Sequence, residues 1–107
     1  MTVQEKHEAL FVQLVAMFHA ATMSQLGKTP NPMTGGIERD LQAAQGSIDV
    51  LDMLLEKTKG NLTTNEQRFL GQMLKELKLN YVDEAAKPAM APEEKNPEDK
   101  PSQETKT

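Results

Sequence analysis

The run Gly27-Lys28-Thr29 is of a type that does chemistry in other proteins, because it matches the end of a loop that binds nucleotide phosphates. That loop also needs an earlier glycine, and Thr22 occupies its position. It further needs a preceding strand, whereas the residues before Gly27 have helical spacing. The run therefore does not predict a nucleotide site. A helix that ends at the glycine explains it better.

The sequence also contains no residue pattern that predicts a metal site or a catalytic site. The chain has no cysteine, and its two histidines, His7 and His19, lie about 120° apart in projection on one predicted helix. Asp49, Asp52 and Glu56 share the polar face of another helix, without the enclosing loop that cation sites use. No serine has a readable base beside it. We predict no catalytic, cofactor-binding or metal-ligating residues, and we expect no enzyme.

Asp40 is the least routine of the polar residues. In projection it falls inside an apolar arc, about 60° from the Ile37 axis. An unpaired buried carboxylate costs several kcal/mol, so the residue is expected either to accept backbone N–H groups at a helix end or to pair with Arg39 or Lys28. The alternative is a ligand-facing role, in which the 28–40 loop contributes to a binding or active site.

Three helices are predicted to position these residues, over about 3–26, 37–58 and 64–81. From Ile37 to Thr58 the apolar residues alternate spacings of four and three, which is typical of a coiled-coil seam. No segment shows the alternation of a strand. The fold class is therefore all-α, an antiparallel three-helix bundle or hairpin.

Capping residues mark where the helices begin. Thr2 and Glu5 have the spacing of a capping box, in which each side chain accepts a backbone N–H of the first turn. The third helix offers two registers, because both Thr63 and Thr64 are followed three residues later by Glu or Gln. Gly60 ends the second helix.

Apolar side chains cover more of the first two helices than a lone bundle of this size needs. The first helix carries one stripe of Leu10, Leu14, Met17 and Ala21 and a second stripe beside it. We predict a homodimer, with a possible further protein partner. Its interface is predicted to contain Phe11, Val15, Phe18, Ala43, Ser47, Val50 and Leu54. Gly46, among small residues, suggests that another helix crosses closely there.

The segment 83–107 differs in composition from the rest of the chain. It holds four prolines in 25 residues, an excess of acids, and no Leu, Ile, Val or aromatic residue. It therefore lacks the apolar surface that offsets ordering entropy. We predict a helical domain over 1–82 and a disordered, Pro-rich acidic tail over 83–107.

The overall balance of charge and apolar residues disfavours several partners. A net charge of -4 argues against general affinity for phosphate backbones, and nucleic-acid binding is not expected. Its only support is a set of five bases: Lys57, Lys59, Arg68, Lys75 and Lys78. No apolar run reaches the length of a membrane span, and no signal peptide is recognisable. We expect a cytoplasmic protein without membrane contact.

Several runs resemble one known family. They include the residues 11–18 (FVQLVAMF), 31–35 (NPMTG) and 56–63 (EKTKGNLT), the last being the most specific. The chain resembles, over about residues 8 to 82, the short bacterial family numbered 1844 among the domains of unknown function. The resemblance implies a bacterial cytoplasmic protein with a helical core. It implies no activity, cofactor or binding residues.

The sequence favours a non-enzymatic, homo-oligomerising protein-interaction module. The first alternative is a ligand-binding or enzyme subunit with a site near the 28–40 loop. The second alternative is a ribosome-associated or nucleic-acid-associated factor.

Overall fold

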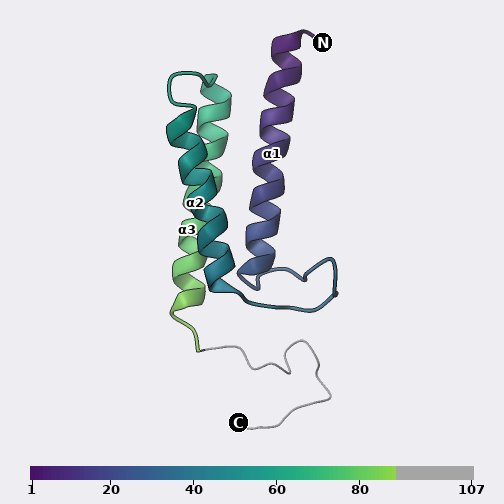
Figure 1. Ribbon diagram of the computed structural model, residues 1–107, viewed down its shortest axis with the longest axis vertical. Coiled ribbons are helices and arrows are strands. Elements are labelled where there is room, and N and C mark those ends of the chain that lie inside the picture. Colours follow the sequence, from purple (N-terminus) through teal and green to yellow (C-terminus); the bar gives the residue numbers. More distant parts are fainter. Residues whose placement is uncertain (89–107) are drawn as a thin grey trace.

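A computed structural model describes residues 1–88 of the chain, and Figure 1 shows their arrangement. Three helices follow one another: α1 (Val3–Gln25), α2 (Leu41–Lys57) and α3 (Thr64–Ala85). α2 runs antiparallel to both α1 and α3, so the beginning of α1 and the end of α2 share one end of the bundle. The predicted all-α antiparallel bundle is confirmed for the described part, which contains no strand.

Local capping explains where α1 and α3 begin. The Thr2 hydroxyl accepts the Glu5 backbone N–H at 3.0 Å, and the Glu5 carboxylate accepts the Thr2 N–H at 2.8 Å. α3 uses the first of its two possible registers, since Thr63 and Glu66 make the same reciprocal pair. Each box satisfies two backbone donors that a helix start leaves free.

α2 begins four residues later than the sequence predicted. Residues 37–40 lie outside the helix, and Asp40 is its N-cap, with a carboxylate that accepts the Ala43 N–H at 3.0 Å. The backbone before Asp40 pairs with the end of α1 and not with α2. Arg39 forms an isolated antiparallel β-bridge with Leu26, and the Asp40 N–H donates to the Gln25 carbonyl at 2.7 Å. The seam predicted from Ile37 therefore starts at Leu41.

α3 is longer than predicted and ends at Ala85, past the position where the tail was expected to begin. Asp83 and Glu84, which sequence composition assigned to the tail, are helical and contact the rest of the fold. The remainder of the predicted tail, 89–107, lies outside the described residues.

The core lies on the shared axis of the three helices. Six buried apolar residues form it: Val15, Ile48, Leu51, Leu70, Leu74 and Leu77. Thr22 is also fully buried and donates its hydroxyl to the Phe18 carbonyl at 2.6 Å. Because the Thr22 hydroxyl donates to a carbonyl of its own helix, it needs no polar partner from α2 or α3.

Candidate interaction surface

The residues predicted to form an interface occupy three different environments. Val15 has no exposed surface and belongs to the core of a single chain, so it is not available to a partner. Phe11 and Phe18 are half-buried and pack against that core. On α2, Val50 is exposed, while three others are half-buried: Ala43, Ser47 and Leu54.

Two side-chain contacts fix how α1 is turned in the bundle. His19 Nε2 lies 3.0 Å from Glu76 Oε1, so this side of α1 faces α3. Gln25 accepts the Ser47 hydroxyl at 2.8 Å, so that side of α1 faces α2. Helical periodicity then places the Leu10 stripe beyond Gln25, on the side away from α3.

An apolar surface covers the outer side of α1 and α2. Its most exposed members are Leu10 (51%), Met17 (61%) and Met53 (48%), and Leu14 and Val50 add to it. We define the α1–α2 face as the set Leu10, Leu14, Met17, Ala21, Ala43, Val50, Met53 and Leu54. Several exposed large apolar side chains on neighbouring helices of a small domain are a sign of an interaction site.

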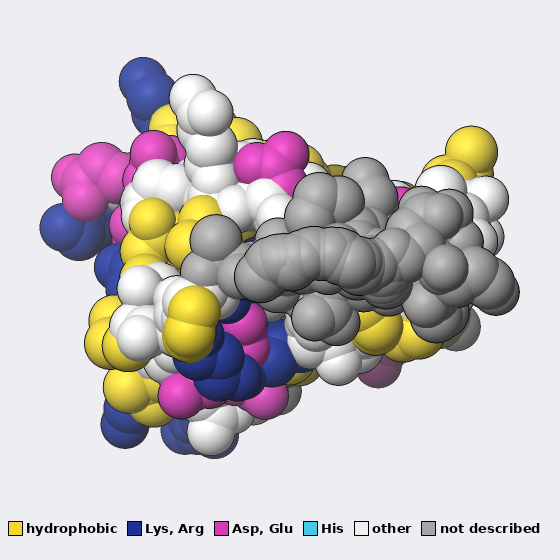
Figure 2. Space-filling model, turned by 90° about the horizontal axis from the view of Figure 1, so that it is seen from below, with side chains coloured by type: hydrophobic (Ala, Val, Ile, Leu, Met, Phe, Trp, Pro, Cys, Tyr) yellow, Lys and Arg dark blue, Asp and Glu magenta, His cyan; other side chains and the backbone are white. Residues whose placement is uncertain are grey.

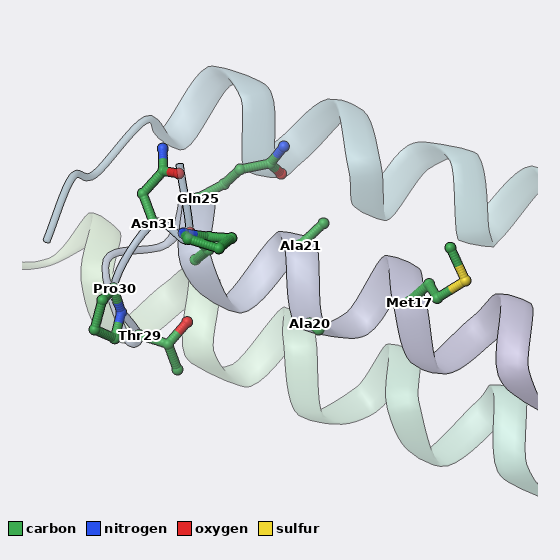
Figure 3. Close-up of a pocket in the computed structure, with 9 residues that line it drawn as sticks. Met17, Ala20, Ala21, Gln25, Thr29, Pro30 and Asn31 are labelled. Atoms are coloured by element: carbon green, nitrogen blue, oxygen red, sulfur yellow. The ribbon is translucent and has the colours of Figure 1, made fainter. Parts of the chain in front are cut away.

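A shallow hollow of about 600 Å³ adjoins this face at the end of α1. Figure 3 shows Met17, Ala20 and Ala21 along the helix, with Pro30 and Asn31 of the connecting segment at the other side. The remaining lining residues are uncharged too: Ser24, Gln25, Thr29 and Pro32. The hollow is therefore suited to apolar or neutral groups.

The segment between α1 and α2 is a compact Ω-loop with its ends held together by the bridge between Leu26 and Arg39. Inside it, the Asn31 N–H donates to the Gly36 carbonyl at 2.8 Å, and the Asn31 side chain accepts the Met33 N–H at 2.8 Å. Gly35 has a φ of 76°, which a side chain would disfavour. These bonds give the loop a defined shape beside the hollow.

Five charged side chains tie the Ω-loop to the end of α3. Lys28 Nζ lies 2.7 Å from Asp83 Oδ2 and 2.8 Å from Glu84 Oε2. Arg39 Nη1 lies 3.2 Å from Glu84 Oε1, and Lys87 Nζ lies 2.8 Å from Glu84 Oε2. Figure 2 looks onto this end of the molecule, where basic and acidic side chains lie against one another. We call these five residues the anchor cluster.

Glu84 is the centre of the anchor cluster. Burial alone raises the pKa of Glu84, but hydrogen bonds from Lys28, Lys87 and Arg39 outweigh it and lower the pKa to about 2. The hydrogen bond from Lys28 is the main cause that lowers the pKa of Asp83. The bonds to Asp83 and then Glu84 raise the pKa of Lys28. All three groups are therefore charged at neutral pH.

A family model described as "Domain of unknown function (DUF1844)" matches residues 8–84. The chain belongs to the DUF1844 family. No curated protein and no solved structure matches the chain. The DUF1844 region includes the α1–α2 face, the Ω-loop and Glu84, and its description assigns no activity to any of them.

Within the DUF1844 region, Lys28 and Asp40, the charged residues that suggested a ligand site, make contacts that stabilise the fold. Asp40 takes the first structural role considered for it, because it caps α2, and it is exposed. Lys28 turns toward α3. Neither residue lines the hollow.

The described part of the chain holds no group of three or more His, Cys, Asp or Glu placed to bind a metal ion. Two carboxylates of α2 have other partners: Asp52 pairs with Lys78 at 3.0 Å, and Asp49 accepts a hydrogen bond from the Gln45 side chain at 2.9 Å. None of the helices in residues 1–88 combines the length and apolar character of a membrane span.

Proposed function

We propose that the protein is a non-enzymatic interaction module in which the α1–α2 face binds a second copy of the chain. The observation that carries this proposal is the exposure of Leu10, Leu14 and Met17 on α1 together with that of Val50 and Met53 on α2. Burial of such side chains against a partner is favourable, at about 25 cal/mol per Å² of apolar surface. We keep a cytoplasmic location as a prediction.

The dimensions of this face suit a dimer. A helix of 23 residues and one of 17 are about 34 and 26 Å long and about 10 Å wide. Side by side they offer about 600 Å² in each copy and about 1,200 Å² in a pair, which is the lower end for a stable interface. Two such helix pairs pack as a four-helix bundle.

Charge favours a two-fold arrangement in which the copies are antiparallel. Lys6 and Lys57 lie at the end of the face where α1 begins and α2 ends, and Asp40 lies at the other end. An antiparallel pair brings the basic end of each copy to the acidic end of the other. The chain's own segment 89–107 is a poor occupant, because it contains no Leu, Ile, Val or aromatic residue.

Light scattering of the full chain after gel filtration tests this proposal. A chain of 11.9 kDa is expected to elute as a dimer of about twice that mass. The double variant Leu10→Glu with Met17→Glu is expected to elute as a monomer, because each dimer would bury four carboxylates without partners. Both positions are exposed in one chain, so the helical circular dichroism is expected to be retained.

The control is Leu79→Glu, which places a carboxylate on a leucine of α3 that is at least as exposed as the two residues of the double variant. It is expected to remain a dimer. A monomeric wild-type chain at several hundred micromolar would overturn the proposal. So would loss of the dimer in the control variant as well as in the double variant.

The ligand-binding alternative retains one supporting observation, the uncharged hollow of about 600 Å³. Such a site would take an apolar or neutral molecule. A thermal shift with a neutral compound, lost on Ala20→Trp in the hollow, would favour it. Of the five bases that support the nucleic-acid alternative, two are in ion pairs, Lys59 with Glu56 and Lys78 with Asp52, which reduces the charge that they offer to a phosphate backbone.

A further inference from the structure

α3 presents a second surface that the proposed dimer does not use. Its outward residues follow one line with spacings of four and three, the pattern by which helices pack against other helices. We define this outer strip of α3 as Arg68, Gln72, Lys75, Leu79, Val82 and Ala86. The core side of α3 is fixed by Leu70, Leu74 and Leu77, so the strip points away from α1 and α2.

The C-terminal half of the strip, which contains Leu79 and Val82, is apolar and exposed to solvent. Leu79 is 63% exposed and Val82 is 66% exposed, more than any other large apolar side chain of α3. Leu79 borders a shallow hollow of about 420 Å³, and Val82 borders one of about 340 Å³ between α2 and α3. Charged residues also line these hollows, Lys75 and Glu76 in the first and Asp52 and Lys78 in the second, so the apolar contact that they offer a helix is at Leu79 and Val82.

The N-terminal half of the strip, which contains Arg68 and Lys75, is basic. Arg68 and Lys75 are exposed and form no ion pair within residues 1–88. The Lys78 ammonium lies beside the strip, bound to Asp52.

Each acid of α3 has a partner in the fold, although Glu76 also borders the hollow beside Leu79. Glu66 closes the capping box and Glu76 binds His19. Asp83 and Glu84 belong to the anchor cluster. Charge is therefore segregated on α3: its carboxylates hold the fold together, and the strip keeps positive charge that no carboxylate of the described chain neutralises.

We propose that the outer strip of α3 binds an acidic amphipathic helix from another protein. Carboxylates of that helix would pair with Arg68 and Lys75, and its apolar residues would cover Leu79 and Val82. The strip spans 19 residues, about 27 Å, so the partner helix needs a similar length. Charge pairing sets partner choice and register, while the apolar contacts supply most of the affinity.

Other occupants fit the strip less well. A second copy would bring like charges together if two strips met. The segment 89–107 is acidic but lacks large aliphatic residues for Leu79 and Val82. Anionic membranes recruit clusters of about four to eight basic residues, and the strip has two.

The test uses a fluorescein-labelled synthetic peptide of 18 residues. One half of the peptide carries leucine at spacings of four and three, and the other half carries glutamate at the same spacings. Its affinity for the full chain is measured by fluorescence anisotropy in low salt. A control peptide carries lysine in place of every glutamate. We expect the acidic peptide to bind at least tenfold more tightly than the basic peptide.

Two variants link that binding to the strip. Arg68→Glu with Lys75→Glu is expected to weaken binding of the acidic peptide at least tenfold, and Leu79→Ser at least threefold. The control, Lys59→Glu, reverses the charge of an exposed lysine that follows α2 and lies off the strip, and it is expected to stay within twofold of the wild type. Circular dichroism melts establish that each variant is folded.

The proposal is overturned if the two peptides bind equally, if neither binds, or if the strip variants bind as the wild type does. Sedimentation with phosphatidylserine vesicles, lost in the Arg68/Lys75 variant while the acidic peptide stays unbound, would assign the strip to a membrane and also overturn it. Dimer mass is measured on the same samples. Because the strip lies away from the α1–α2 face, this proposal and the dimer can fail separately.

Discussion

The Arg39 guanidinium and the Glu84 carboxylate lie 3.2 Å apart, and their side chains are only 7% and 6% exposed. The two residues are 45 positions apart in the sequence. Arg39 also donates to the Glu84 and Pro88 carbonyls, so one side chain holds both the last turn of α3 and the chain that follows it. This pair joins the segment before α2 to the end of α3.

Replacement of Glu84 by Gln is expected to lower the free energy of unfolding by about 3 kcal/mol. The change removes the charge that compensates Arg39, Lys28 and Lys87 at a shielded site, and broken buried pairs typically cost this much. Urea denaturation followed by circular dichroism measures it. Asp83→Asn is the control: that side chain is 57% exposed, so a loss of less than about 1 kcal/mol is expected. Equal losses in both variants would contradict a central role for Glu84.

Acid is expected to weaken the wild-type fold through the same residue. The pKa of Glu84 is about 2 in the folded chain and about 4.5 in its ordinary state, so the unfolded chain takes up a proton first as pH falls. The contribution of Glu84 is complete above about pH 4.5 and is lost between that value and pH 2. Urea midpoints across this range should fall more steeply for the wild type than for Glu84→Gln. Parallel curves would show that other carboxylates govern the acid response.

The sequence could predict those features that neighbouring residues determine. The capping box of Thr2 and Glu5 is local, and α1 begins where it predicts. α2 begins after its N-cap Asp40, a local role that the sequence offered, but residues 37–40 are held outside the helix beside the Leu26–Arg39 bridge and the Arg39–Glu84 contact, which no local pattern contains. The sequence showed two stripes on α1 and assigned the interface to the one with Phe11, Val15 and Phe18, whereas the exposed stripe of one chain is that of Leu10, Leu14 and Met17. Which stripe faces inward depends on where α2 and α3 lie, and Val15 is inward while Leu14 is outward.

The choice of register at the start of α3 can be tested with adjacent threonines. Thr63→Ala removes a hydroxyl that accepts the Glu66 N–H at 3.1 Å and donates to Glu8 at 3.0 Å. Loss of an N-cap of this kind costs about 1 kcal/mol, and the lost contact with α1 adds to it. Thr64→Ala changes an exposed residue of the first turn and is expected to leave stability within about 0.5 kcal/mol. Thermal melts of the two variants, compared with the wild type, measure the difference. A larger loss for Thr64→Ala would indicate the other register.

Gly46 provides a test that bears on both the single chain and the dimer. The sequence suggested that another helix crosses closely there, but a Cβ added at Gly46 would meet nothing within 4 Å in one chain. Its backbone is helical, so Gly46→Ala is expected to raise the free energy of unfolding of the monomer by about 1 kcal/mol. Gly60→Ala is the contrast: Gly60 has a φ of 82°, where a side chain strains the backbone, and a loss of about 1 kcal/mol is expected.

Both glycine variants are best measured in the Leu10→Glu, Met17→Glu background, where the expected monomer removes any contribution from a second copy. If Gly46→Ala stabilises that monomer but weakens association in the otherwise wild-type chain, the close helix crossing is between copies. If it stabilises the monomer and leaves association unchanged, the second copy does not approach α2 at Gly46. A destabilised monomer would contradict the open space found around this residue.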